Sequence, residues 1–163
     1  MSAQLMDGKA LAAQKKAAIR AEVERLARTP GLAVVLVGEN PASQIYVRSK
    51  ARDCEECGIR CMDFRLPAQT TESELLTLIA ELNGRADVDG ILVQLPLPEG
   101  IRERRVLEAI APEKDMDAFH PENVGRLVQG QARYLPCTPA GVMELLRAAG
   151  VDPAGRRAVI VGR

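Results

Sequence analysis

Apolar and polar positions along the chain predict helices and strands in alternation. Between residues 11 and 26 apolar side chains recur at helical spacing, and the turn-forming residues 29–31 follow. Residues 32–37 are then an unbroken apolar run of strand length. Such a run is typical of a parallel strand that is covered on both faces of its sheet.

The alternation continues through the middle of the chain. A helical pattern over 42–57 precedes a second predicted strand, 59–66, whose charged residues indicate partial exposure. Thr71 and Glu74 have the spacing of a capping box and predict the start of a third helix. Residues 90–95 are predicted as a third strand, which prolines end.

The pattern weakens after the third strand. A short helix is predicted over 106–110, followed by a polar, irregular stretch over 113–136 of a length that is usually functional. Thr138 and Pro139 predict the N-cap and the first turn of another helix. Residues 157–163 are predicted as a last strand that runs into glycine.

Strands that alternate with helices predict an α/β fold, a three-layer αβα domain with a mainly parallel sheet. An apolar strand that runs into glycine is how a dinucleotide-binding unit begins. Residues 157–163 are therefore either an ordinary last strand or part of a larger design of which this chain is one half.

Composition narrows the class of protein. The 163 residues carry 22 basic and 22 acidic side chains, and this balance argues against nucleic-acid binding. No apolar run approaches the roughly 18 residues that span a bilayer, and no signal segment is recognisable. Cys54, Cys57 and Cys61 lie across a helix end and a strand start, which predicts buried free thiols. We expect a cytoplasmic protein with no membrane partner.

Three residues suggest a site at one edge of the predicted sheet. Tyr46 and Lys50 stand four apart on a helix, so they share one face near the carboxyl ends of the strands. They are either part of a ligand site or a half-buried tyrosine beside a solvated lysine. Gln94 lies inside an apolar strand, where an unpaired amide would cost about 1–3 kcal/mol. Its partner is either a loop backbone or a ligand, and its place at the strand's carboxyl end favours a site.

The long loop contains a second group of polar residues. Asp115, Asp117 and His120, the only histidine, suggest a metal site, but they lack a recognised ligand spacing. We therefore predict no metal. A carboxylate in this loop can instead accept two N–H bonds from a heterocycle.

Five sequence blocks in order resemble the bifunctional methylenetetrahydrofolate dehydrogenase/cyclohydrolase family. They are residues 37–43 with Tyr46-x-x-x-Lys50, and then residues 90–98, 114–121, 123–127 and 136–141. The resemblance implies one-carbon folate metabolism, in which 5,10-methylenetetrahydrofolate is oxidised with NADP to the methenyl form, which is hydrolysed to 10-formyltetrahydrofolate. It also implies that residues 1–138 bind tetrahydrofolate derivatives and that the full-length protein is a homodimer. Residues 139–163 would then be a connecting helix and the first strand of a truncated Rossmann domain that binds NADP.

The resemblance assigns substrate binding to six residues: Tyr46, Lys50, Val93, Gln94, Leu95 and Asp117. Lys50 is then the catalytic group that transfers protons, and Gln94 orients Lys50 or the attacking water. Tyr46 stacks on the folate, and Asp117 accepts the donor edge of the pterin. Ala118 stands where the family usually has glycine, so a positive φ at this position would strain the backbone.

NADP is the cofactor that the resemblance implies, and Gly162 and Arg163 match the start of its binding domain. Two residues cannot hold a nicotinamide in place, so we expect this chain to lack the dehydrogenase step. Two alternatives stay open. One is a non-catalytic folate-binding domain, and the other is a different two-domain α/β dehydrogenase, such as a shikimate or amino-acid dehydrogenase relative.

Overall fold

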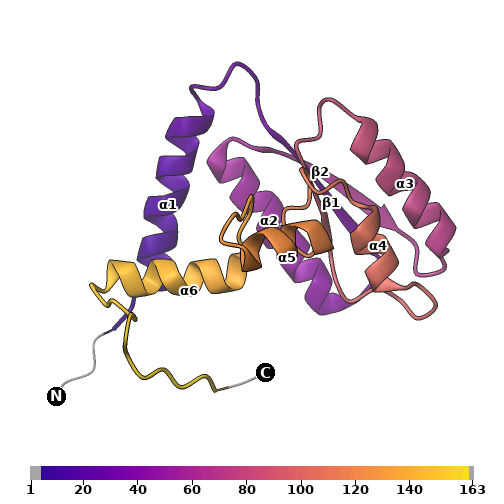
Figure 1. Cartoon of the computed structure of the whole chain (residues 1–163). Helices are drawn as coiled ribbons and strands as arrows, with labels where there is room; N and C mark the ends of the chain where they lie inside the picture. The colour runs from indigo at the N-terminus through magenta and orange to yellow at the C-terminus, as the bar shows by residue number, and fades with distance from the viewer. Residues whose placement is uncertain (1–4, 162–163) are drawn as a thin grey trace.

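A computed structural model describes residues 5–161, which form helices around a small parallel sheet (Figure 1). The three strands are β1 (Gly31–Val37), β2 (Arg60–Leu66) and β3 (Gly90–Val93), in the order β2-β1-β3. The helices are α1 (Gly8–Val23), α2 (Pro41–Cys57), α3 (Glu72–Gly84), α4 (Glu103–Ala109), α5 (Pro121–Val128) and α6 (Cys137–Ala148). Both pairings of the central strand are parallel, as the sequence predicts.

The central strand β1 is buried on both faces, which explains its unbroken apolar run. On one face Val35 packs with Ile79 of α3 and Val106 of α4. On the other face Val34 packs with Val47 of α2, and α1 contacts the outer side of α2 (Figure 1). The predicted three-layer αβα arrangement is confirmed.

Local signals in the sequence set the starts of two helices. The Asn40 side chain accepts hydrogen bonds from the backbone of Ala42 and Ser43, so α2 begins directly after the turn that follows β1. The predicted capping box is present at α3, where Thr71 and Glu74 bond each other's backbone N–H groups. These caps direct both helices back along the sheet.

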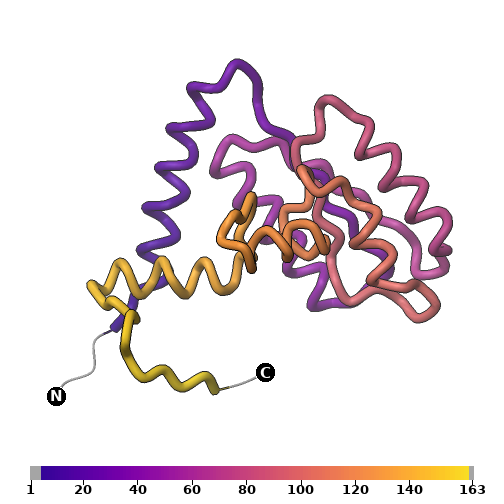
Figure 2. Tube along the Cα trace, in the orientation of Figure 1, coloured from indigo at the N-terminus to yellow at the C-terminus, as the bar shows by residue number. Residues whose placement is uncertain are grey.

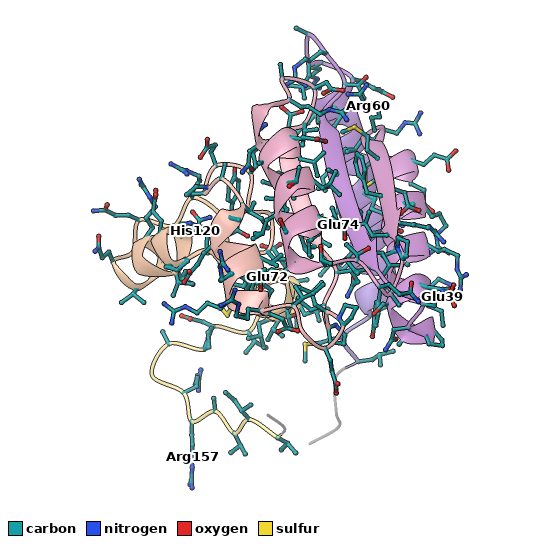
Figure 3. The ribbon with its side chains drawn as sticks, turned by 90° about the vertical axis from the view of Figure 1, so that its right-hand side faces the viewer. Glu39, Arg60, Glu72, Glu74, His120 and Arg157 are labelled. Atoms are coloured by element: carbon teal, nitrogen blue, oxygen red, sulfur yellow. The ribbon has the colours of Figure 1, made fainter. Side chains whose placement is uncertain are left out.

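A carboxylate between α3 and α4 joins these two helices (Figure 3). Glu72 accepts hydrogen bonds from the Arg102 backbone and guanidinium, at 2.6–2.9 Å, and from Arg105 at 2.7 Å. Its side chain is only 14% exposed. Hydrogen bonds from Arg102 lower the pKa of Glu72 to about 2.

Several predicted boundaries are wrong. The stretch 113–136 is not wholly irregular, because it contains α5, whose start is marked by the His120 N-cap and Pro121. The last helix begins at Cys137 after Pro136, without the predicted Thr138 side-chain cap. β3 ends at Val93, one residue before Gln94.

The predicted last strand is absent from residues 157–161, the part of it that the structure describes. Val159, Ile160 and Val161 are largely exposed, and the segment that follows α6 extends away from the sheet (Figure 2). A strand needs a neighbour to bond its N–H and C=O groups, and no described strand lies beside this segment. Among residues 5–161, no helix is long and apolar enough to cross a membrane.

We expect Glu72→Gln to lower Tm at neutral pH, because the variant loses the charged partner of Arg102 and Arg105. A lowered pKa in the folded state stabilises the protein above the ordinary glutamate pKa of 4.5, and this contribution disappears as the pH falls toward 2. The Tm difference between wild type and variant should therefore shrink between pH 5 and pH 3 in thermal unfolding. Glu81→Gln, on the exposed side of α3, should show no such trend; a difference that does not change with pH would contradict the assignment.

Candidate active site

Lys50 and Gln94 are joined by a direct hydrogen bond at the carboxyl edge of the sheet. The Lys50 ammonium Nζ donates to Oε1 of Gln94 at 3.0 Å. Nε2 of the same amide donates to the Leu95 carbonyl oxygen at 2.7 Å, so the backbone fixes which end of the amide faces the lysine. The Gln94 backbone N–H in turn donates to Val35 of the central strand at 2.8 Å. Of the two partners that the sequence left open for Gln94, a loop backbone or a ligand, the loop backbone is present as the Leu95 carbonyl, and the other end of the amide is bonded to Lys50.

The loop before α5 runs beside β3 as a short extension of the sheet. The Ile91 N–H donates to the Lys114 carbonyl at 2.7 Å, and the Met116 N–H donates to the Ile91 carbonyl at 3.4 Å, which makes a parallel bridge between Ile91 and Asp115. Gly90 permits this approach, because a Cβ at position 90 would lie 2.5 Å from Cγ of Met116. The pairing carries the chain toward the edge of the sheet where Gln94 lies.

Asp117 is the loop residue that this pairing delivers to Lys50. Burial raises the pKa of the half-buried Asp117 carboxyl, while the nearby charge of Lys50 acts in the opposite direction and that of Asp115 adds to the increase. No hydrogen-bond donor within residues 5–161 contacts the Asp117 carboxylate. Its oxygens are free to accept N–H groups from a ligand.

The neighbouring charges of the loop have structural roles. The Lys114 ammonium donates to the carbonyl oxygens of Leu82, Asn83 and Arg85 at 2.8–3.2 Å and so binds the C-terminal end of α3. Asp115 is buried and accepts the His120 backbone N–H at 2.8 Å. Of the charged side chains at positions 114, 115 and 117, only that of Asp117 has no hydrogen-bond partner among the described residues and can accept one from a ligand.

His120 is the N-cap of α5. Its Nδ1 accepts the backbone N–H of Glu122 at 3.1 Å, and Figure 3 shows it at the start of this helix. Within the part of the chain that the structure describes, no three His, Cys, Asp or Glu side chains are grouped to hold a metal ion.

The remaining predicted site residues differ in how far their side chains are exposed. Tyr46 lies on α2 with 62% of its surface exposed, so its ring is accessible to a ligand. Leu95 is half-buried beside Gln94. Val93 does not fit its predicted role as a pocket-lining side chain, because it is 2% exposed within the core between the sheet and α3. Gly162 and Arg163 lie outside the described residues.

The cysteines do not form a metal cluster, but they are less uniformly buried than expected. Cys54 and Cys57 are buried, Cys61 is half-buried on a strand at the edge of the sheet, and Cys137 is exposed at the start of α6. Burial raises the pKa of the Cys54 thiol to about 12, which keeps it protonated and unreactive.

One residue of the site region was missed by the sequence analysis. Asn123 is fully buried on α5 and bonds to Asp115, which lies two residues before Asp117. The sequence does contain a relevant pattern, because a histidine followed by proline at 120–121 is typical of a helix start. A helix there would have given Asn123 a defined inward position.

Comparison with known proteins adds information about the chain that is independent of this geometry. Residues 6–117 match the family model described as "Tetrahydrofolate dehydrogenase/cyclohydrolase, catalytic domain". The "Bifunctional protein FolD" of Nitratidesulfovibrio vulgaris (strain Miyazaki F) is 59% identical over 163 residues, which cover 98% of this chain and 57% of that protein. The chain thus spans little more than half the length of the curated relatives it matches.

Solved structures agree with this match. The bifunctional methylenetetrahydrofolate dehydrogenase/cyclohydrolase FolD of Campylobacter jejuni is 50% identical with a TM-score of 0.89, over 91% of this chain and 54% of that one. The dehydrogenase-cyclohydrolase of Trypanosoma brucei, solved with NADP cofactor and an inhibitor, is 37% identical with a TM-score of 0.89, over 95% of this chain and 55% of that one. The alternative that the chain is a different two-domain dehydrogenase, matching these motifs by chance, is excluded.

Ala118, beside Asp117, has φ +56° and is the only residue other than glycine with positive φ in the described chain. This conformation costs alanine about 1–2 kcal/mol. We expect Ala118→Gly to raise the free energy of unfolding by roughly 0.5–1 kcal/mol, because the relief of strain exceeds the entropy and methyl burial that glycine gives up.

Urea unfolding at neutral pH measures this effect. Ala80→Gly on the exposed face of α3, where the backbone is helical, is the matched control and should lower the free energy of unfolding by about 1 kcal/mol. If both variants lose stability equally, the strain at Ala118 is not real.

Proposed function

Because the chain belongs to the tetrahydrofolate dehydrogenase/cyclohydrolase family, we propose that its Lys50 site binds a tetrahydrofolate derivative and hydrolyses 5,10-methenyltetrahydrofolate to the 10-formyl form. The observation that carries the proposal is the 3.0 Å hydrogen bond from Lys50 to Gln94, with the open carboxylate of Asp117 close to the lysine. A proton-transfer group, a group that orients it and a ligand-binding carboxylate are therefore together at one edge of the sheet.

The reaction needs proton transfer at two points. Water adds to the cationic methenyl carbon and loses a proton, which gives a neutral hydroxylated ring. The bond from that carbon to N5 then breaks as the hydroxyl proton is removed, the formyl group forms on N10, and N5 gains a proton. One proton is released overall. Lys50 can accept the proton as an amine and return it as an ammonium, and Gln94 holds its Nζ in position for both steps.

Three residues supply the contacts that hold the folate. Asp117 accepts the amino group and the adjacent ring N–H of the pterin, since one carboxylate matches two parallel donors. The exposed Tyr46 ring stacks on the folate, and half-buried Leu95 contributes an apolar contact. Val93 contributes at most its backbone, because its side chain is in the core.

The oxidation of methylenetetrahydrofolate with NADP is proposed only for the whole protein. The residues expected to begin the cofactor domain, Gly162 and Arg163, lie outside the described structure, and residues 157–161 form no strand. The described part of the chain thus has no glycine-rich turn that fits a dinucleotide, and we assign no step to NADP here. The division at residue 138, the homodimer and the cytoplasmic location stay predictions.

We expect Lys50→Ala to reduce hydrolysis of methenyltetrahydrofolate by at least about 100-fold, because it removes the proton-transfer group. Absorbance of the methenyl compound measures the rate, after subtraction of uncatalysed decay. Lys9→Ala, an exposed lysine on α1, is the matched control and should keep the wild-type rate. Calorimetry with tetrahydrofolate separates the outcomes: heat of binding without turnover would leave a folate-binding domain, and neither binding nor turnover would refute the proposal.

Asp117→Asn should weaken tetrahydrofolate binding about tenfold or more, because the amide offers only one acceptor to two donors. Wild-type binding requires the carboxylate, so affinity should fall as the pH drops through the pKa of Asp117, which lies above the ordinary 3.8. The ratio of variant to wild-type Kd, measured by calorimetry from pH 7.5 to pH 4.5, should shrink toward one as the pH falls. A ratio of one at neutral pH would contradict the assigned contact.

A further inference from the structure

Asn123, on α5, is not among the residues proposed to contact folate. Its side chain is nevertheless hydrogen-bonded to the loop that carries Asp117. We propose that Asn123 is a positioning residue, which holds the Asp117 carboxylate in its binding geometry by way of Asp115. The inference rests on the proposed function, since it concerns the affinity of the same site for folate.

The Asn123 amide connects both ends of this loop. Its Nδ2 donates to the Pro112 carbonyl at 2.8 Å and to Oδ2 of Asp115 at 2.9 Å. The same Oδ2 atom accepts the His120 backbone N–H at 2.8 Å. Residues 112, 115 and 120 are thus joined through one amide nitrogen and one carboxylate oxygen, and Asp117 lies between two of these points.

The unused half of the amide supports this interpretation. Oδ1 of Asn123 is buried and has no hydrogen-bond partner among the described residues. An unsatisfied buried carbonyl costs about 1–3 kcal/mol, and an apolar side chain of similar volume would avoid this cost. Two hydrogens on one nitrogen can reach two acceptors at once, which serine, with one donor, and leucine, with none, cannot do. The amide is therefore suited to fixing the spacing of Pro112 and Asp115.

The strained backbone shows why this spacing matters for Asp117. Ala118, the next residue, has φ +56° and is buried. A strained conformation persists only where the surroundings determine it by several contacts. Here these are the hydrogen bonds that the His120 backbone N–H and the Asn123 amide donate to the Asp115 carboxylate. Without the Asn123 amide, Ala118 is expected to relax toward negative φ and to turn the Asp117 carboxylate away from Lys50.

A double-mutant cycle tests whether Asn123 acts through Asp117. We expect Asn123→Leu to raise the Kd for tetrahydrofolate at least tenfold in the wild-type background and less than twofold in the Asp117→Asn background. Asn83→Ala is the matched control, because Asn83 also bridges two backbone groups, the Ala109 carbonyl and the Ala111 N–H, at 2.8 and 2.9 Å. This variant should lower Tm but leave Kd within twofold. If Asn123→Leu does not fold, Asn123→Ser takes its place in the same cycle.

Equal effects of Asn123→Leu in both backgrounds, or an equal rise in Kd for Asn83→Ala, would overturn the proposal and leave Asn123 a purely structural residue. A second readout needs no folate and separates this inference from the proposed function. In NMR titrations of the Asp117 carboxyl carbon, the pKa should fall toward 3.8 in Asn123→Leu, as the carboxyl becomes more exposed, and should not change in Asn83→Ala. An unchanged titration in Asn123→Leu would also overturn the proposal, whether or not the protein binds folate.

Discussion

The backbone pairing between Ile91 and the segment 114–116 is the contact on which the site depends. Lys50 lies on α2 and Gln94 directly follows β3, and the loop of Asp117 is brought toward them by its hydrogen bonds along β3. The pairing requires glycine at position 90, since a Cβ there would overlap Met116. A parallel sheet gathers the ends of its strands at one edge, and this short pairing adds a fourth segment to that edge without a fourth strand.

Three charged groups within four residues of this loop show how burial separates structural from functional roles. Lys114 has three carbonyl partners, and buried Asp115 accepts two hydrogen bonds, so both charges are compensated in the folded protein. Asp117 is partly desolvated without such compensation, which is why its pKa is raised. A carboxylate in that condition gains more from ligand N–H groups than one already bonded, because the cost of removing its water was met during folding.

The sequence predicted those features that depend on local spacing. Local spacing was sufficient to place Lys50 and Gln94 together at one edge of the sheet. It put Lys50 on the same helix face as Tyr46, and it put Gln94 at the end of a strand. Two features were missed or wrongly predicted because they depend on distant partners. Asn123 has a role only because its helix packs on Asp115, and residues 157–161, although 158–161 are apolar, form no strand without a described neighbour. Val93 shows a different limit, since the resemblance assigned it to substrate binding without showing that its side chain packs in the core.

The two reactions of the family make opposite demands on this edge of the sheet. Hydrolysis consumes water, so an exposed Tyr46 and a lysine that solvent can reach are compatible with it. Hydride transfer requires a nicotinamide held against the folate and protected from water. In the proposed hydrolysis, Lys50, the Gln94 amide that is bonded to it and the open carboxylate of Asp117 would all act directly. The part of the chain that the structure describes therefore meets the demands of the proposed hydrolysis at the edge of the sheet that carries Lys50.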